Sequence, residues 1–381
     1  MQYLICRLLL VGFMPLSVVA CAADLPADER MAIVEDSLRA NAALDSLRAL
    51  EQQVNACLEA YNAQFHPLAM VDSVAADSSK DEIIPPELRQ AVVDYDYEIG
   101  EDPDFARTQG WPVAMPRQAV GSILPCRRVV AYYGNPRSRR MGVLGEYPRD
   151  EMLRRFQAAV AEWNAADPQH PVTPALHLIV SVAQPHPGRS GLYRNWMPDS
   201  LIEEVYSWAR SAGAITILDL QIGQSTVQAE IPRIEHFLRR PDVHLALDPE
   251  FAMRNGRVPG QYVGSLDAAD INWASEYLAS LVREHGLPPK LLVIHRFTRP
   301  MVTNASAIQL RPEVQIIMDM DGWGAPHLKR SSYHSYVVRE PVQFTGFKIF
   351  YHNDRRGHGR PIMTPADVLR LRPQPLYIQY Q

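Results

Sequence analysis

The sequence lacks three features that would assign it to common functional classes. It has no excess of basic residues, because 38 Lys and Arg stand against 43 Asp and Glu, for a formal net charge of −5. We therefore expect no nucleic-acid partner, since such binding needs a concentrated positive surface. No Cys-x-x-Cys spacing of the kind that holds zinc occurs, and we predict neither a metal nor a cofactor. Beyond the N-terminal apolar run, no segment approaches the roughly 18 apolar residues of a membrane-spanning helix.

What the sequence does contain is ordinary globular composition with extra proline. Of its 381 residues, 47% are hydrophobic and 21% are charged, which is enough apolar material for a full core. The 31 prolines exceed the usual frequency of about 5%. They concentrate between the regular segments, as expected of long loops.

The first 21 residues are similar to a bacterial lipoprotein signal. An apolar run follows Arg7 and ends in Val18-Val19-Ala20-Cys21, which looks like a lipobox. The resemblance implies a signal peptide over residues 1–20, cleavage before Cys21 and acylation of its sulfur. We therefore expect a membrane-anchored protein of the cell envelope that faces the periplasm or the exterior. Ala22 follows the cysteine, which implies the outer membrane in a cell with two membranes. A soluble secreted protein is the alternative.

Export would place the remaining cysteines in an oxidising compartment. Cys6 lies in the signal segment and Cys21 takes lipid, which leaves Cys57 and Cys126. We predict a disulfide between these two, closing a long loop. The alternative is that they are two unrelated buried thiols.

Residues 21–127 are predicted to form a helical and irregular accessory region. Apolar residues recur at helical spacing between Asp28 and Tyr61, with a gap after Leu38 in which the only apolar residues are alanines. The pattern predicts one long helix, or a helical hairpin that turns near Asn41. The stretch 73–104 is acidic and punctuated by proline, and we interpret it as linker and irregular cover.

From residue 128 to 381, short apolar runs alternate with amphipathic helices. The predicted strands are Val129–Tyr133, Leu176–Ala183, Ala214–Gln221, Val243–Phe251, Leu291–Phe297, Val314–Asp321, Phe347–His352 and Leu376–Tyr380. Helices are expected at Asp150–Ala166, Ser200–Ser211, Glu230–Leu238 and Ala268–Glu284. This α/β alternation predicts a (β/α)8 barrel of the TIM type. An open doubly wound sheet is the alternative, but it needs a glycine-rich phosphate turn after its first strand, and Gly134-Asn135-Pro136 is not one.

Polar residues follow the C-terminal ends of these predicted strands, whereas the strand starts show no such enrichment. They are Asn135, Gln184, Asp219, Gln221, Asp248, Glu250, His295, Asp319, Asp321, Tyr351 and His352. Because barrels place their chemistry at this end, we expect these side chains to surround one site. Some have plainer interpretations, such as His295 as a satisfied core histidine or Asp319 as the ion-pair partner of Lys348.

The fourth predicted strand carries the strongest candidates. Period-two alternation puts its apolar residues on one face and the other side chains, including Asp248 and Glu250, on the opposite face. Burial and a like-charged neighbour would both raise the pKa of Glu250 towards the range of a general acid. The plainer interpretation is that both residues belong to a solvated turn, with Asp248 bonding backbone N–H groups near Pro249.

A long, glycine-rich loop at 252–264 follows these carboxylates directly. Loops of this kind build walls or lids over barrel sites. Aromatic residues on predicted loops can stack on sugar rings, although aromatics also fill cores. The predicted substrate-binding set is Asn135, Gln221, His295, Trp196, Tyr262, Trp323 and Tyr351.

The stretch Leu245-Ala-Leu-Asp248-Pro-Glu250 resembles the fourth-strand Asp-x-Glu of barrel-type peptidoglycan muramidases. It is also similar to the end of the chitinase-type Asp-x-Asp-x-Glu signature, with Ala246 replacing the first Asp, and Ala131-Tyr-Tyr-Gly134 is similar to the chitinase first strand. The resemblance implies that Glu250 is the general acid and that Asp248 assists it. The first-strand Asp of the muramidases has no counterpart, and Asn135 is the nearest polar residue.

Two further segments, Gly264–Asp270 and Leu287–His295, look like an uncharacterised family of secreted bacterial barrel proteins. This second resemblance implies a fold and no activity.

These patterns favour an envelope-anchored glycoside hydrolase that acts on a cell-wall or other extracytoplasmic glycan. Hydrolysis needs one protonated carboxyl, here Glu250, and one carboxylate, for which Asp219, Asp319 and Asp321 are the candidates. One alternative is a glycan-binding envelope protein without turnover. Another is a phosphodiesterase in which Asp248, Glu250, Asp319 and Asp321 hold Ca²⁺ or Mg²⁺ and His295 or His327 is the base. No recognisable metal-ligand spacing supports this last alternative.

Overall fold

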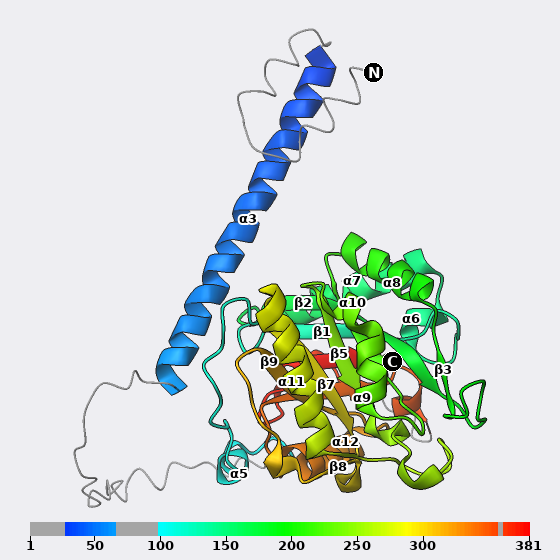
Figure 1. Ribbon diagram of the computed structural model, residues 1–381. Coiled ribbons are helices and arrows are strands. Elements are labelled where there is room, and N and C mark those ends of the chain that lie inside the picture. Colours follow the sequence, from blue (N-terminus) through cyan, green and yellow to red (C-terminus); the bar gives the residue numbers. More distant parts are fainter. Residues whose placement is uncertain (1–26, 66–97, 357–360) are drawn as a thin grey trace, which may run out of the picture. The chain divides into compact units, whose positions relative to one another are not determined.

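The computed structural model of the chain describes residues 27–65, 98–356 and 361–381 (Figure 1). The chain divides into two compact units, Met1–Cys57 and Leu58–Gln381. Helix α3 (Ala27–Phe65) is a single unbroken helix. The long-helix prediction is therefore confirmed, and the alternative of a hairpin turning near Asn41 is wrong.

The predictions made for the N-terminus have different outcomes. The predicted signal peptide over residues 1–20 and the predicted lipid attachment at Cys21 lie outside the described residues. Cys57 and Cys126 are both disulfide-bonded. Among the helices of the described ranges, none combines the length and apolar character that crossing a membrane requires.

Eight parallel strands in the described part of the Leu58–Gln381 unit close into a barrel, which confirms the predicted (β/α)8 fold (Figure 1). In hydrogen-bonded order they are β1 (Arg128–Gly134), β2 (Val172–Ala183), β4 (Ile215–Leu220), β5 (Val243–Leu247), β7 (Lys290–Arg296), β9 (Val314–Met320), β10 (Phe344–Ile349) and β11 (Tyr377–Tyr380). Pairing of β1 with both β2 and β11 closes the ring. A short antiparallel strand, β3 (Arg194–Trp196), pairs with the end of β2.

Helices lie between most successive barrel strands, and the longer ones bury one face each; the connection from β7 to β9 holds only the 3-10 turns η5 (Arg299–Met301) and η6 (Ala305–Ala307). In α7 (Arg149–Ala166) the buried residues Met152, Phe156, Ala159 and Trp163 recur every three or four positions, so a single stripe packs inward. The other helices are α5 (Pro103–Thr108), α6 (Val143–Glu146), α8 (Asp199–Ser211), α9 (Val227–Glu230), α10 (Glu235–Leu238), α11 (Ala268–His285), α12 (Pro326–Tyr333) and α13 (Pro365–Leu369).

Several strand limits differ from the predictions. The second strand begins at Val172 rather than Leu176, because its first residues already pair with β1. The seventh spans Phe344–Ile349 rather than Phe347–His352, because Phe344 pairs with β9. The fourth ends at Leu247 and is followed by the 3-10 turn η3 (Pro249–Phe251), which Asp248 caps. The two-residue strands β6 (Leu266–Asp267) and β8 (Val302–Thr303) were not predicted.

Side chains along each strand alternate between the helical layer and the barrel interior. On β7, Leu292 and Ile294 belong to the outer core, whereas Leu291 and Val293 pack in the inner one. The inner face continues to His295, which is fully buried. The same step leads from Ala175 to His177 on β2. On these two strands the inner face is therefore apolar first and polar where the strand ends.

The segment before β1 fills the N-terminal end of the barrel with satisfied amide groups. Gln315 at the start of β9 accepts the N–H groups of Ile123 and Leu124, both at 3.1 Å. Its own Nε2 donates to the Leu124 carbonyl at 2.6 Å and to Gln118 Oε1 at 2.7 Å. Gln118 in turn exchanges two hydrogen bonds with Asn62, at 2.8 and 3.0 Å. This end of the barrel is thus closed by packing and by a chain of amide hydrogen bonds, although Ser122 Oγ and His244 Nε2 are buried there without a partner among the described residues.

Candidate active site

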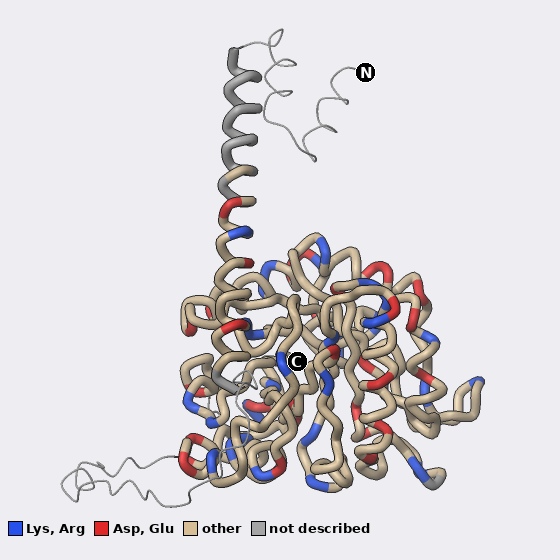
Figure 2. The backbone as a smooth tube through the Cα atoms, turned by 60° about the vertical axis from the view of Figure 1, so that its left-hand side comes forward, with Lys and Arg blue, Asp and Glu red and all other residues tan. Residues whose placement is uncertain are grey.

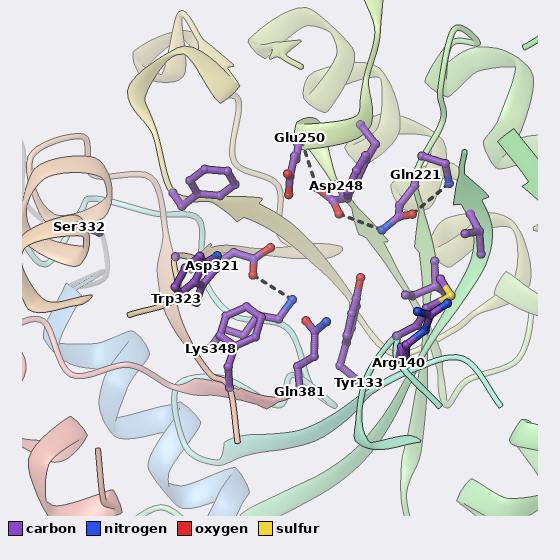
Figure 3. A pocket seen from close by; sticks show the side chains of 18 residues that line it. Tyr133, Arg140, Gln221, Asp248, Glu250, Asp321, Trp323, Ser332, Lys348 and Gln381 are labelled. Carbon is purple, nitrogen blue, oxygen red and sulfur yellow. Dashed lines mark hydrogen bonds and ion pairs between the residues drawn. The ribbon is translucent and has the colours of Figure 1, made fainter. Parts of the chain in front are cut away.

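A cavity of about 460 Å³ lies at the end of the barrel where the strands finish (Figure 3). Because the C-terminal ends of parallel strands meet there, residues far apart in the sequence share its wall. The polar and charged lining comprises Tyr133, Arg140, Gln221, Asp248, Glu250, Asp321, Ser332, Lys348 and Gln381. The prediction that polar strand ends converge on one site is therefore met by Gln221, Asp248, Glu250 and Asp321.

The turn after β5 places both predicted carboxyls at the cavity. Asp248 Oδ1 accepts the backbone N–H of Glu250 at 3.1 Å, and its Oδ2 accepts Gln221 Nε2 at 3.3 Å. Gln221 is itself fixed because its Oε1 accepts the N–H of Ala183 at 3.0 Å. Asp248 therefore combines both sequence interpretations: it caps a local turn and it lines the cavity. Its side chain positions Glu250.

The carboxyl of Glu250 is the cavity's strongest candidate for a proton donor. Burial, and then the negative charge of Asp321, raise the pKa of Glu250 to about 7, against the opposing effects of Lys348 and His295. A carboxyl with a pKa in this range is protonated in a large fraction of molecules at neutral pH. The like-charged neighbour predicted from the sequence was Asp248, but the charge that acts on Glu250 is that of Asp321.

Asp321 is the ionised counterpart. Burial alone would raise its pKa, but Lys348 and His295 outweigh burial and hold the pKa of Asp321 below its ordinary value. Lys348 Nζ lies 2.9 Å from Asp321 Oδ1 (Figure 3) and 4.0 Å from the centre of the Tyr133 ring. The expected partnership of Lys348 with Asp319 is wrong, because Asp321 lies one inward position nearer the mouth and takes the ammonium.

Three predicted site residues, Asp219, His295 and Asp319, are enclosed beneath the cavity with 0% exposure. None of them belongs to the cavity lining. His295 Nδ1 is 3.3 Å from an oxygen of Asp319 and 3.3 Å from an oxygen of Asp321, and its Nε2 is 3.5 Å from Asp219 Oδ2. Asp219 and Asp319 therefore lie too deep to face a substrate in the cavity, which leaves Asp321 as the second carboxylate.

The predicted substrate-binding residues have mixed placements. Gln221 and Trp323 line the cavity, and Trp323 is 56% exposed. Tyr262 is 52% exposed but lies outside the lining. Asn135 is buried and shapes the turn after β1, donating to the Ile179 carbonyl and accepting the N–H of Arg137.

The remaining candidates are held by structural contacts. Trp196 Nε1 donates to Glu230 at 2.6 Å, and the Tyr351 hydroxyl lies 3.0 Å from that of Tyr132. His327 is exposed and does not line the cavity. The four carboxyls considered for Ca²⁺ or Mg²⁺ do not, within the described residues, bring ligand atoms close enough to share one ion.

Sequence reasoning missed Lys348 and gave Tyr133 too little weight. Both occupy inward positions of their strands, because Tyr133 follows Val129 and Ala131 on β1 and Lys348 follows Gly346 on β10. Alternation along each strand could therefore have found them. Arg140 and Ser332 lie outside the strands, and no strand alternation marks them. Gln381 directly follows β11 and continues the inward alternation of Tyr377 and Gln379, so the same period could have found it.

Comparison with known proteins adds a limited similarity of fold. No family model and no curated protein matches the chain. Solved structures with partial similarity include the cellulase Cel5C_n, at 12% identity and TM-score 0.34, over 59% of this chain and 65% of that one. The alkaline cellulase K catalytic domain matches at 13% identity and TM-score 0.36, over 68% and 74%. A ruminal GH26 endo-β-1,4-mannanase matches at 12% identity and TM-score 0.33, over 67% and 59%. The overlap is partial, so the chemistry of this chain rests on its own side chains.

Proposed function

We propose that the cavity is the active site of a glycoside hydrolase in which Glu250 is the proton donor and Asp321 is the paired carboxylate. The supporting observation is that the three carboxyls of the cavity have pKa values displaced in opposite directions: those of Asp248 and Glu250 are raised, whereas that of Asp321 is lowered. Such a split assigns the acid and the base of a carboxylate pair. Glycosidic bond hydrolysis is the reaction that needs one of each across the scissile bond.

The proposed reaction uses residues already placed at the cavity. Protonated Glu250 gives its proton to the glycosidic oxygen while the bond from that oxygen to the anomeric carbon breaks. Ionised Asp321, held by Lys348, stabilises the positive charge that develops on the anomeric carbon. Water then adds to that carbon and gives a proton to the Glu250 carboxylate. Glu250 is then protonated again and Asp321 is still ionised, as before the reaction. Asp248 is a positioning residue, because it acts through the backbone of Glu250.

The proposed substrate is a glycan without dense charge. In Figure 2, acidic and basic residues are interspersed over the described Leu58–Gln381 unit rather than gathered in one patch. Exposed Trp323 offers an apolar face for a sugar ring at the cavity. Location in the cell envelope is a further proposal, which rests on residues 1–20 and Cys21. Acyl mass on Cys21, and release of the protein from membranes by Cys21→Ala, would support it.

The decisive experiment compares wild-type protein with Glu250→Gln on peptidoglycan and a panel of β-glycans, scoring new reducing ends. Glutamine keeps the size and removes the proton, so we expect a rate loss on the order of 10²–10⁴ with unchanged thermal stability. Asp242→Asn is the matched control. Asp242 accepts the Tyr206 hydroxyl just before β5 begins, at the other end of that strand, so its variant should keep wild-type activity. A normal rate in Glu250→Gln would place the acid elsewhere.

A further inference from the structure

Beneath the cavity lies a second group of side chains that the proposed reaction does not use. His177 of β2, Asp219 of β4 and His295 of β7 each offer one ligand atom, and these atoms lie within 4.8 Å of one another. Asp219 Oδ2 is 3.7 Å from His177 Nε2 and 3.5 Å from His295 Nε2. All three residues have 0% exposure. Three strands therefore aim two imidazoles and one carboxylate at one enclosed point.

Most polar atoms of these three side chains lack hydrogen-bond partners among the described residues. Within the described residues, His177 Nε2, both nitrogens of His295 and both oxygens of Asp219 make no hydrogen bond. A buried polar atom without a partner lowers the stability of the folded chain, and a charged group does so more strongly. Buried charges are normally paired with hydrogen bonds or bound to a metal. Five such atoms in one cluster therefore indicate an absent partner rather than a packing defect.

The separations fit two ligands of one ion better than they fit hydrogen bonds. Charge-assisted N–H···O bonds span about 2.7–2.9 Å, and the contacts here are longer, at 3.5 and 3.7 Å. Zinc bonds of about 2.0–2.2 Å at a tetrahedral angle place neighbouring ligand atoms roughly 3.3–3.5 Å apart. The ligand atoms of the cluster thus have nearly the spacing of a zinc site, and small side-chain movements would bring them to it.

Both histidines also have an oxygen on the side away from the cluster. His177 Nδ1 is 2.6 Å from the Tyr377 hydroxyl and 2.9 Å from Gln379 Nε2, and His295 Nδ1 is 3.3 Å from the nearest oxygens of Asp319 and Asp321. Metal-bound imidazoles usually donate their second N–H to an oxygen of this kind, which fixes the ring.

Space for this layer is built into the barrel. A Cβ on Gly346 would lie 2.6 Å from Asp319 Oδ1, so the outer carboxylate needs glycine on the neighbouring strand β10. Tyr133 lies between the cluster and the cavity, with its ring centre 5.1 Å from that of His177 and 5.8 Å from that of His295. The cluster is therefore closed off from a substrate, which suits a structural ion better than a reacting one.

We propose that His177, Asp219 and His295 bind one divalent transition-metal ion inside the barrel, with Zn²⁺ as the preferred ion. Zn²⁺ commonly binds a set of two imidazoles and one carboxylate. Ca²⁺ and Mg²⁺ prefer oxygen ligands, so two imidazole nitrogens make this set a poor site for them. The inference departs from the sequence-based expectation of no metal, and it does not depend on the proposed hydrolase activity. Through His295 the ion would fix Asp321 from below, which links the barrel interior to the mouth.

The test measures Zn²⁺ on the full chain. Because the cluster is enclosed, the protein is unfolded with chelator and refolded with and without Zn²⁺, then freed of loose ion by dialysis. We expect one Zn²⁺ per chain by elemental analysis, a higher thermal midpoint in the Zn²⁺-refolded sample, and d–d absorption typical of a tetrahedral site when Co²⁺ replaces Zn²⁺. The proposal would be overturned if wild-type protein folds equally well without Zn²⁺ and retains none after refolding with it. In that case the three side chains would bind a proton rather than a metal ion.

Variants separate this site from adventitious binding. Asp219→Asn keeps the shape of the side chain and removes the anionic ligand, so Zn²⁺ affinity should fall by more than the roughly 10–100-fold typical of outer-contact losses. His236→Ala removes a half-exposed surface histidine and should leave affinity and stoichiometry unchanged. If Asp219→Asn does not fold, His177→Gln replaces it in the same assay. Wild-type Zn²⁺ affinity in a folded variant of either ligand would also refute the site.

Discussion

The two ends of the barrel interior differ in how many of their buried polar atoms are hydrogen-bonded. At the N-terminal end, Gln315 makes four hydrogen bonds, although Ser122 Oγ and His244 Nε2 make none among the described residues. Towards the other end, the side chains of His295 and Asp219 are equally buried, and none of their polar atoms has a hydrogen-bond partner within the described ranges. Unsatisfied buried groups lower stability, so their concentration at one end is consistent with a functional role there. It agrees with the general polarity of (β/α)8 barrels.

Among the substitutions that test this comparison between the two ends of the barrel, we expect the largest effect on kcat at Asp321. Asp321→Asn removes the carboxylate that would stabilise the reacting sugar, so kcat should fall on the order of 10²–10⁴. Asp319→Asn is the matched variant, because the same residue type lies one inward position deeper and outside the lining. It should lose much less activity. The measurement is kcat of both variants on the substrate found for the wild type. Equal losses of kcat would mean that the cavity-lining Asp321 is no more important for the reaction than the enclosed Asp319.

The pH profile sharpens the same assignment. The proposed acid works only when protonated, and the pKa of Glu250 is about 7. The rate should therefore be retained at lower pH and fall as the pH rises through about 7, by roughly tenfold for each further unit. In Asp321→Asn the charge that raises the pKa of Glu250 is lost, so this fall should move to lower pH. An alkaline limb that does not move would show that Asp321 does not act on the proton donor.

A third prediction addresses the opposite end of the barrel. Gln315→Ala leaves the N–H groups of Ile123 and Leu124 without their acceptor, at about 1–3 kcal/mol for each buried group. The free energy of unfolding, measured by denaturant titration, should fall by roughly 2–6 kcal/mol for the two groups together, while kcat stays unchanged. Gln157→Ala on the exposed face of α7 is the control and should have almost no effect. A loss of kcat without a loss of stability in Gln315→Ala would reverse the roles of the two ends.

The sequence predicted which end of the barrel carries the site better than it predicted which residues share the cavity. Alternation along a strand is local, so the fold and the end of β5 as part of the site followed from it, but the positions of Asp248 and Glu250 depend on the turn η3, which strand alternation does not describe. Depth in the barrel depends on the stagger between strands, which pairs Asp319 with Gly346 and brings Lys348 to Asp321. That stagger cannot be read from one strand. The hydrogen bond from Trp196 to Glu230 likewise depends on strand β3 and helix α9 meeting in space.

The smallest expected effect tests whether the rim binds sugar. Trp323 is 56% exposed and lines the cavity, whereas Tyr262 is 52% exposed and does not. An aromatic contact contributes about 0.5–1.5 kcal/mol beyond simple burial, so Trp323→Ala should raise KM by roughly two- to tenfold and leave kcat nearly unchanged. Tyr262→Ala should change neither constant. Because the two side chains are almost equally exposed, general surface stickiness would affect both variants alike, and only a contact made inside the cavity separates them. Equal KM values for Trp323→Ala and the wild type would remove the rim from the proposed binding site and leave the carboxyl pair as its whole basis.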